Sequence, residues 1–566
     1  AVAMTGGQPH DGELTVERIA LQMVGEGVKK IWILTEDLDR YKDRGKIPQD
    51  IEILYRDQLE AVQLEAREVK GCTIIIFDQV CAAEKRRRRK RGTYPDPAKR
   101  VFINDAVCEG CGDCSDQSNC VSIEPIETEL GRKRMINQSS CNKDYSCLKG
   151  FCPSFVSVVG GELKKPKITG LEALLKNIPQ PKINVIESEY NILVAGVGGT
   201  GVLTIGGLLG MAAHVDGVAS NLLDMTGLAQ KGGAVLTHVR LGKDIEILRT
   251  PHILTGCADL LLACDLVVGA SPNAIECIRK GRAQSVINSH NTPVSSFVEN
   301  NQIDFQQENL KESIEQHTSD HGRHYVEATE LATVLLGDAI ATNIFMLGYA
   351  WQKGLIPLSF AALEKAIELN AVAIEQNKKT FACGRMAAHD MARLEQFAAP
   401  FKNTALHPKI SNTTEQVISK RSQMLVDYQD QDYRDKYLNL LKKVKTVDDQ
   451  NIYDAVAKSY FKLLAIKDEY EVARLYTNGD FMAKLNAQFS GDYQLKFHMA
   501  PPIFEKKDKR TGEVQKREFG PWMLGALKLI AKFKFLRGGM FDIFGYSAER
   551  KMERQLIGEY EQIVEI

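Results

Sequence analysis

The sequence lacks an excess of charge, a long apolar run and any mark of secretion. Its 72 Lys and Arg stand against 73 Asp and Glu, a formal net charge of -1, so overall charge gives no indication of nucleic acid or an anionic membrane as partner. The longest apolar stretch, 258–270, is interrupted by Asp259 and Asp265. It is shorter than the roughly 18 residues of a membrane span, and we expect it to be a buried strand. No basic segment followed by an apolar core stands near the N-terminus, so we expect a cytoplasmic protein.

The composition is otherwise that of an ordinary globular protein. Hydrophobic residues make up 44% and charged residues 26% of the chain, which excludes a disordered chain and a coiled coil. At roughly 100 to 200 residues per domain, a length of 566 residues predicts three to five domains, and the fold class that the patterns below predict is α/β multidomain.

The residue patterns divide the chain into five segments. Residues 1–100 alternate helix patterns (16–26, 57–69) with strand patterns (30–34, 72–77) and are typical of the trailing part of an open α/β domain. Residues 101–160 are rich in Cys and Gly and too poor in apolar residues to fold without a staple. A linker with three Pro, 161–190, precedes 191–399, whose order of strand, glycine turn and helix predicts a doubly wound, Rossmann-like domain. Helical periodicity over 400–566 predicts a mostly α domain.

Cysteine is concentrated in one segment. Seven of the 13 Cys lie between Cys108 and Cys152, and an odd number without a secretion signal favours reduced thiols that bind metal over a disulfide framework. The spacing opens with C-x2-C-x2-C and closes with Cys-Pro, as in two-cluster ferredoxins, in which the fourth Cys of each run binds the other cluster. The predicted ligands of a first four-iron cluster are Cys108, Cys111, Cys114 and Cys152.

The second set of ligands has one thiol fewer. Cys120, Cys141 and Cys147 supply three thiolates, and Asp144 fills the middle of the spacing C-x2-D-x2-C. A carboxylate is a harder ligand than a thiolate and competes with protons, so iron at this corner would be weakly held. We expect either a four-iron cluster with an Asp ligand or a three-iron cluster. The alternative is zinc, which fits a subset of four Cys.

A glycine-rich turn follows the apolar segment 191–195. Its glycines allow close approach of the backbone, and the apolar helix after it presents free amides to a phosphate. The next predicted strand ends at Asp224, about where a ribose-binding acid would lie in an NAD or FAD domain. The glycines of the turn are Gly196, Gly198, Gly199 and Gly201.

A second glycine loop departs from the dinucleotide pattern. Lys231, Gly232 and Gly233 stand where such folds usually continue into a helix, and two loops side by side favour a larger phosphorylated ligand. A glycine turn that serves packing alone is the remaining alternative, because a single motif of this kind is weak.

Three features in this order carry a family resemblance: the ferredoxin-like cysteines lie between AMTGGQP (residues 3–9) and the pair VAGVGGTGVLT and MTGLAQKGGAV. The chain resembles the C-terminal half of the fused indolepyruvate ferredoxin oxidoreductases, which are thiamine-diphosphate-dependent 2-oxoacid:ferredoxin oxidoreductases. The resemblance extends over the whole chain and includes FDQVCAAEKRRRRKRG, INQSSCNKDYSC, KDEYEVARLY and KREFGPWM.

The resemblance implies oxidative decarboxylation of a 2-oxoacid to an acyl-CoA, with electrons passing through the clusters to ferredoxin. Indolepyruvate or another arylpyruvate is implied by family alone, as are the role of the glycine-rich domain as a γ domain that serves coenzyme A and a homo-oligomeric state. Thiamine diphosphate and Mg²⁺ would need a G-D-G motif and a later Asn that lies just before the AVAMTGGQ segment, and neither is part of this sequence. The trailing edge of that site remains as Thr5, Gly6, Gly7 and Gln8. No catalytic residue is implied.

Two other functions stay open. A ferredoxin-fused NAD or FAD oxidoreductase would use the first glycine turn and Asp224, and a non-catalytic electron-transfer scaffold would need only the clusters. The basic run Lys85–Arg91 is either a solvated surface or a docking patch for an acidic ferredoxin.

Overall fold

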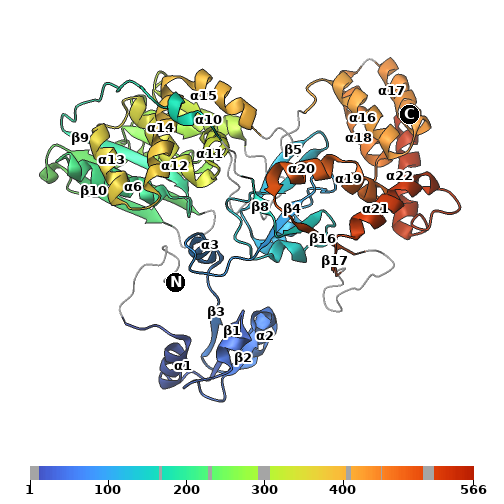
Figure 1. Cartoon of the computed structure of the whole chain (residues 1–566), viewed down its shortest axis with the longest axis horizontal. Helices are drawn as coiled ribbons and strands as arrows, with labels where there is room; N and C mark the ends of the chain where they lie inside the picture. Colours follow the sequence, from blue (N-terminus) through green and yellow to red (C-terminus); the bar gives the residue numbers. More distant parts are fainter. Residues whose placement is uncertain are drawn as a thin grey trace. The chain divides into compact units, whose positions relative to one another are not determined.

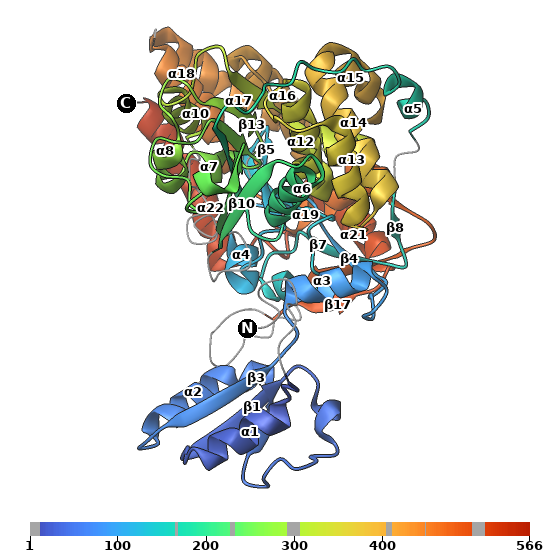
Figure 2. The same ribbon diagram turned by 90° about the vertical axis from the view of Figure 1, so that its left-hand side faces the viewer.

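The computed structural model describes residues 12–164, 168–226, 233–290, 306–402, 410–447, 449–500 and 515–565 (Figures 1 and 2). They belong to two compact units, Ala1–Asp96 and Pro97–Ile566. No helix among these residues is both long enough and apolar enough to cross a membrane.

The first unit holds a parallel sheet in the order β2-β1-β3. The strands are β1 (Lys30–Thr35), β2 (Glu52–Tyr55) and β3 (Thr73–Asp78), and the helices are α1 (Val16–Gly25), α2 (Leu59–Glu68) and α3 (Ala82–Lys90). β1 is buried along most of its length, which explains its continuous apolar sequence. The helices and strands predicted over 16–26, 30–34, 57–69 and 72–77 are all present, each with nearly the predicted bounds.

The cysteine-rich segment forms part of an antiparallel sheet of order β17-β16-β7-β4. β4 (Lys99–Ile103) and β7 (Phe155–Val159) flank the cysteines, while β16 (Gln494–Met499) and β17 (Arg517–Phe519) come from the C-terminal region. A hairpin of β5 (Ile123–Thr128) and β6 (Gly131–Ile136) lies between the two groups of cysteines in the sequence. The C-terminal region is mostly helical, as predicted, but it is not a separate domain, because two of its strands complete this sheet.

The glycine-rich domain is built on a six-stranded sheet of order β10-β11-β9-β12-β13-β14. Its strands are β9 (Glu189–Val197), β10 (Ala219–Thr226), β11 (Ala234–Gly242), β12 (Leu260–Ala263), β13 (Gln284–Asn288) and β14 (Arg323–Val326). β9, β12, β13 and β14 are parallel, but β11 runs antiparallel between β9 and β10. The sheet is therefore mixed, whereas the expected doubly wound sheet is parallel.

Helices cover both faces of this sheet, as a doubly wound fold requires. One face packs against α6 (Val202–Val215), α12 (Thr342–Gln352), α13 (Phe360–Leu369) and α14 (Ile374–His389) (Figure 1). The other packs against α7 (Leu266–Gly269), α8 (Pro272–Cys277) and α10 (Gln307–Glu315). Residues of β9 alternate between the two cores, since Ile192 and Val194 face the first and Leu193 and Ala195 the second.

The prediction that the segment 258–270 forms one buried strand is wrong. Only Leu260–Ala263 is extended, and the buried Asp265 ends the strand because its carboxylate accepts the amide of Val268 at 3.0 Å and caps α7. The predicted linker also contains structure, since β8 (Glu162–Leu163) pairs with β15 (Phe489–Ser490) and α5 spans Leu171–Leu174.

The C-terminal region contributes two helical groups. α16 (Thr414–Tyr428), α17 (Gln431–Val444), α18 (Gln450–Leu464) and α22 (Ala548–Glu565) share a core rich in Tyr. α19 (Glu469–Thr477), α20 (Asp480–Gln488) and α21 (Met523–Lys532) pack on the cysteine-domain sheet, where Tyr476, Phe481 and Leu527 join Phe102 and Val158 in one core. α11 (Ala328–Leu336) and α15 (Met391–Ala398) complete the helices of the glycine-rich domain.

Candidate functional site

The first predicted ligand set lies at the two ends of the cysteine segment. Cys108 and Cys111 follow β4 on the loop that leads into α4 (Asp113–Ser118), Cys114 lies in the first turn of α4, and Cys152 lies shortly before β7. Because β4 and β7 are paired neighbours, the ends of the segment return to the same place. Gly110 turns the loop with a φ of 73°, and its amide donates to Sγ of Cys108 at 3.3 Å.

Electrostatics shows that these four thiols are neighbours. Burial and then the charge of Cys152 raise the pKa of Cys108. Burial and then the charge of Cys108, with smaller contributions from Cys152 and Cys111, raise the pKa of Cys114 to about 12. Groups that perturb one another in this way repel when all are thiolates, so a positively charged centre among them would be needed to hold them ionised.

The second predicted set is also brought together. Burial raises the pKa of Cys147, and the charges of Cys120, Cys141 and Asp144 raise it further. Burial likewise raises the pKa of Cys141, to which Cys120 and Asp144 contribute in the same direction. The charge of Cys114 also raises the pKa of Cys147, so the two sets are neighbours. Asp144 therefore lies within electrostatic range of Cys141 and Cys147, and its role as a ligand stays a prediction.

The backbone on both sides of Asp144 is strained. Lys143 and Tyr145 have φ values of 53° and 63°, a region in which residues other than Gly are uncommon. Lys143 Nζ donates to the carbonyl of Pro97 at 3.0 Å, and the Tyr145 hydroxyl donates to the carbonyl of Lys99 at 2.9 Å. The carboxylate itself accepts the amide of Ser146 at 3.2 Å. These contacts hold Lys143 and Tyr145, on either side of Asp144, in an unfavourable conformation, which is common at ligand sites.

The donor chemistry suits iron–sulfur clusters. All 13 Cys are free thiols, and Cys108, Cys114, Cys120, Cys147 and Phe155 share one buried core. In the part of the chain that the structure describes, no three His, Cys, Asp or Glu side chains are grouped to hold a single metal ion. A cubane does not require such a group, because each thiolate binds a different iron atom.

Cations surround the first ligand set, and sequence reasoning missed them. Arg134 is 1% exposed and Lys133 5% exposed, both on β6. Burial lowers the pKa of Arg134, and the charges of Cys114 and Cys108 oppose that shift. Two lysines of the C-terminal region, Lys467 and Lys516, donate to backbone carbonyls of the cysteine segment. No local motif marks these lysines, because they are distant in sequence.

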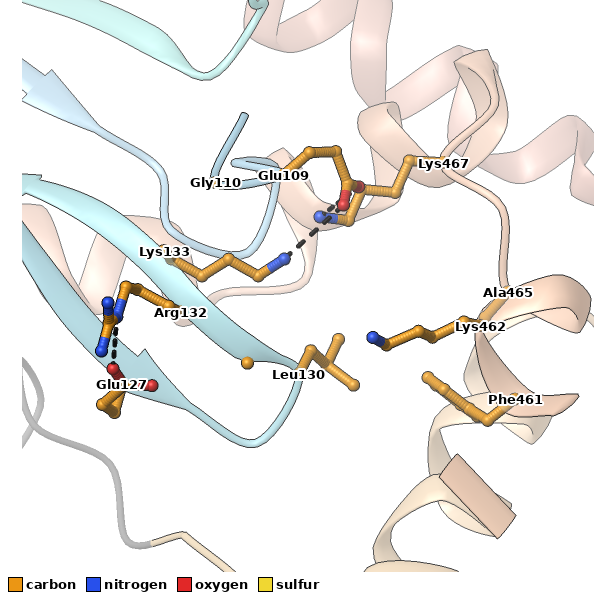
Figure 3. A pocket seen from close by; sticks show the side chains of 11 residues that line it. Glu109, Gly110, Glu127, Leu130, Arg132, Lys133, Phe461, Lys462, Ala465 and Lys467 are labelled. Atoms are coloured by element: carbon orange, nitrogen blue, oxygen red, sulfur yellow. Dashed lines mark hydrogen bonds and ion pairs between the residues drawn. The ribbon is translucent and has the colours of Figure 1, made fainter. Parts of the chain in front are cut away.

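A pocket of about 520 Å³ opens beside the loop that carries Cys108 and Cys111 (Figure 3). Lys133 and Lys467 both point at the carboxylate of Glu109 on that loop, at 3.6 and 2.7 Å. The lining residues are Glu109, Gly110, Glu127, Leu130, Gly131, Arg132, Lys133, Phe461, Lys462, Ala465 and Lys467.

The first glycine turn joins β9 to α6. Gly199 and Gly201 have positive φ values of 84° and 101°, and Gly201 is the N-cap of α6. Gly196 lies within β9, where a Cβ would come within 2.6 Å of Val202 Cγ2. Gly198 donates its amide to the carbonyl of Gly233 at 2.8 Å. This bond joins the first turn to the end of the second glycine loop.

Several predicted residues lie elsewhere or outside the described residues. Lys231 and Gly232 are outside them, as are Thr5, Gly6, Gly7 and Gln8. Asp224 lies inside β10, not at its end, and accepts the hydroxyl of Thr237 at 2.7 Å. Because β11 separates β10 from β9, Asp224 does not occupy the place of a ribose-binding acid on the strand next to the turn. This arrangement disfavours the dinucleotide alternative.

The basic run forms most of α3. Glu84 is buried and accepts Nε of Arg87 at 2.9 Å and Nε of Arg88 at 3.1 Å, while Lys85 pairs with Glu36. Much of the charge of this helix is therefore compensated within the first unit, which weakens the case for a docking patch.

Comparison with known proteins finds two families. Residues 191–387 match the pyruvate ferredoxin/flavodoxin oxidoreductase family, and residues 414–566 match a family of unknown function, DUF6537. The indolepyruvate oxidoreductase subunit IorB of Pyrococcus horikoshii is 29% identical over 214 residues, which cover 36% of this chain and 99% of that protein. The same subunit of Thermococcus kodakarensis is 28% identical over 212 residues, with the same coverage. Among solved structures, the pyruvate oxidoreductase subunit PORC of Thermotoga maritima is 21% identical, with a TM-score of 0.26, over 35% of this chain and 96% of that one.

Proposed function

From the premise that the chain is a 2-oxoacid:ferredoxin oxidoreductase, similar to the indolepyruvate enzymes, we propose that it serves the oxidation of an arylpyruvate to an acyl-CoA. The reaction joins a 2-oxoacid to coenzyme A, releases carbon dioxide and yields two electrons and one proton. The cysteine segment would hold two iron–sulfur clusters, which would supply one-electron transfer to ferredoxin. The clusters supply single-electron carriers, a chemistry that no side chain provides.

The single observation that carries this proposal is the grouping of the cysteines. The pKa shifts couple Cys108, Cys111, Cys114 and Cys152 as one set, and Cys120, Cys141, Asp144 and Cys147 as a second. The ferredoxin spacing demands the same partition, in which Cys152 returns to the first run. Seven thiolates and one carboxylate supply eight ligand positions, which is the number that two cubanes need.

The glycine-rich domain supports coenzyme A as the acyl acceptor. The bond between Gly198 and Gly233 brings the two glycine loops together at the end of β9, and the N-terminus of α6 begins there. Backbone amides at such a terminus favour an anionic phosphate. The proposed role of these residues is to bind the phosphates of coenzyme A.

Thiamine diphosphate with Mg²⁺ would complete the enzyme. The chain has no G-D-G motif, so these residues cannot by themselves supply the site that the resemblance implies. In the proposed enzyme, Thr5, Gly6, Gly7 and Gln8 form the edge of that site and a segment with the G-D-G motif forms the rest. A non-catalytic scaffold remains the second candidate, and the missing motif favours it for this chain taken alone.

Steady-state reduction of methyl viologen tests the proposal. The chain is combined with the segment that carries the G-D-G motif, and indolepyruvate is added with and without coenzyme A. We expect viologen reduction that depends on both substrates. Activity that requires NAD and ignores coenzyme A would contradict the proposal and favour the dinucleotide alternative. Clusters without any turnover would favour the scaffold.

A further inference from the structure

The C-terminal domain reaches the first ligand set from one side through Lys467. This lysine lies between α18 and α19 and donates from Nζ to the carbonyls of Val107 at 3.2 Å and of Cys108 at 3.0 Å. Its third contact is an ion pair with Glu109 at 2.7 Å (Figure 3). An ammonium has three N–H donors and a neutral amine has two. The three acceptors therefore match the charged form, on a side chain that is only 13% exposed.

The same domain reaches the other end of the ligand set. Lys516, directly before β17, donates from Nζ to the carbonyl of Cys152 at 3.1 Å and lies 5.2 Å from the ring centre of Phe155. Next to it, the hydroxyl of Tyr476 in α19 donates to the carbonyl of Pro153 at 2.7 Å. One domain thus places a cation at both ends of the chain segment that supplies the first set.

The two ligand sets have different charged surroundings. Lys133, Arg134, Lys467 and Lys516 all lie within electrostatic range of Cys108, Cys114 or Cys152. Lys516 also lies within electrostatic range of Cys147 of the second set. The main charge effects on Cys141, however, come from Cys120 and Asp144, which raise its pKa, and the only cation among its causes, Arg100, lowers it by less. The positive charge is concentrated on the first set.

A cluster that accepts one electron gains one negative charge, and nearby positive charge in a poorly solvated site favours the reduced form. We propose that the C-terminal domain, through Lys467 and Lys516, raises the reduction potential of the first cluster above that of the second. The inference rests on the proposed function, since it requires clusters on these cysteines. The cluster gains one electron from the 2-oxoacid during turnover, or from a one-electron chemical reductant in the test, and no bond in the protein forms or breaks. The C-terminal domain would thereby make the first cluster the electron sink of the pair.

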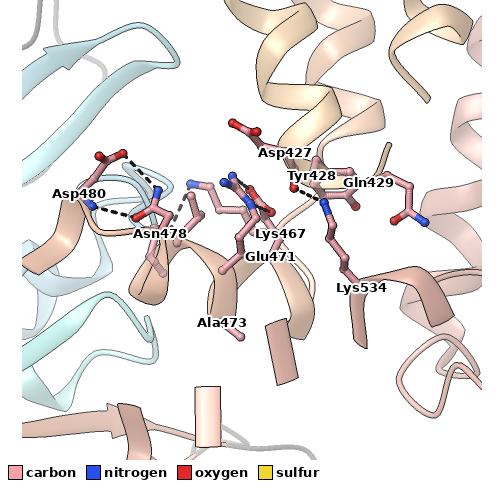
Figure 4. Close-up of polar contacts among 12 residues, drawn as sticks. Asp427, Tyr428, Gln429, Lys467, Glu471, Ala473, Asn478, Asp480 and Lys534 are labelled. Atoms are coloured by element: carbon pink, nitrogen blue, oxygen red, sulfur yellow. Dashed lines mark hydrogen bonds and ion pairs between the residues drawn. The ribbon is translucent and has the colours of Figure 1, made fainter. Parts of the chain in front are cut away.

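The chain offers a matched control for Lys467. Lys534 also donates from Nζ to two consecutive carbonyls, those of Val426 at 3.4 Å and of Asp427 at 2.7 Å (Figure 4). It lies in the same domain, and its charged neighbours are Arg474, Asp427, Arg537 and Glu471, with no cysteine among them. Loss of this lysine, which also bridges two consecutive carbonyls, should leave both clusters unchanged.

The test is a redox titration of the full chain, followed by electron paramagnetic resonance after reconstitution with iron and sulfide. The unaltered chain should show two clusters with separate potentials. In Lys467→Met, the ratio of oxidised to reduced first cluster at a fixed potential should rise about tenfold. The reduction potential of that cluster should therefore become ~59 mV more negative for a one-electron couple. The charge-preserving Lys467→Arg should shift it much less, and Lys534→Met should shift neither cluster. Lys516→Met should also lower the potential of the first cluster.

The outcomes separate this inference from the proposed function. Intact clusters whose potentials do not change in Lys467→Met and Lys516→Met would overturn the inference and leave the proposed function standing. If Lys467→Met fails to hold the first cluster, Lys516→Met decides on the same criterion. An unaltered chain that binds neither iron nor sulfide in cluster proportions would overturn both.

Discussion

Asp144 is the residue at which the cysteine segment departs from a two-cluster ferredoxin. Its neighbours Lys143 and Tyr145 have positive φ values, and Cys141 and Cys147 both sense its charge. A carboxylate binds iron less strongly than a thiolate does and competes with protons for it. The corner iron held by Asp144 should be the first to leave.

We predict that air oxidation converts the second cluster to a three-iron form and leaves the first intact. Electron paramagnetic resonance should show a three-iron signal from about half of the clusters, given one such corner in two clusters. Asp144→Cys should abolish that signal and give two four-iron clusters. Asp144→Asn removes the carboxylate at equal size and should release the corner iron as Fe²⁺ without air, so that a one-electron oxidant alone then gives the three-iron signal. A spectrum that is the same in Asp144→Cys as in the unaltered chain would show that Asp144 is no ligand.

The spacing of the cysteines could predict which of them are near one another. Most of them are separated by only a few residues, and Cys152 is brought to the first run by one pair of strands. The spacing assigned Cys152 to the first set across more than thirty intervening residues, and β4 and β7 pair to bring it there. Lys467 and Lys516 could not be predicted, because they are 359 and 364 residues from the cysteines whose carbonyls they bind. A single Lys in a charged helical region has no distinguishing pattern.

At the scale of elements, the turn between β9 and α6 should bind phosphate. We predict that Gly198→Val raises the Michaelis constant for coenzyme A and changes the turnover number little, because a branched side chain there blocks the approach of a phosphate to the backbone. The matched control is Gly207→Ala, on α6 itself, where an added Cβ meets no atom within 4 Å. A loss of thermal stability in Gly198→Val without any change in the Michaelis constant for coenzyme A would show that the turn serves packing alone.

Helices α12 and α14 cross closely through two glycines. A Cβ on Gly384 would lie 1.9 Å from the carbonyl oxygen of Phe345, and one on Gly348 would lie 2.1 Å from that of Phe381. Because backbone atoms cannot move aside cheaply, Gly384→Ala should destabilise the glycine-rich domain by about 1–3 kcal/mol. The loss of stability is measured by thermal unfolding, monitored by circular dichroism. Gly207→Ala is the control and should be neutral or stabilising. An unchanged unfolding midpoint in Gly384→Ala would mean that the two helices are not in contact at this place.

Elements with local signals were predicted well and those with distant partners were not. The strand patterns over 30–34 and 72–77 are confirmed by β1 and β3, since continuous apolar runs mark buried parallel strands. The antiparallel insertion of β11 between β9 and β10 was missed, because hydrophobic periodicity does not specify which strands pair. The segment 258–270 was read as a strand over its full length, although the capping carboxylate of Asp265 divides it.

At the scale of the whole molecule, the C-terminal region is part of the cysteine domain. β16 pairs with β7, and Tyr476, Phe481 and Phe497 pack with Phe102 in one core. Helical periodicity over 400–566 gave no sign of this, since the strand β16 is a single short segment whose partner lies more than 300 residues earlier. Residues 414–566, which match the family of unknown function, therefore lie against the cysteine segment and contact the backbone of Cys108 and Cys152.

The most direct test of the account is the reduction of the chain's own clusters by the 2-oxoacid. The chain, combined with the segment that carries the G-D-G motif, is mixed anaerobically with indolepyruvate and coenzyme A, and the visible absorbance of the clusters is followed in a single turnover. We predict bleaching that requires both substrates and leaves reduced clusters detectable by electron paramagnetic resonance. Clusters that stay oxidised with both substrates present, or that NADH alone reduces, would contradict the account.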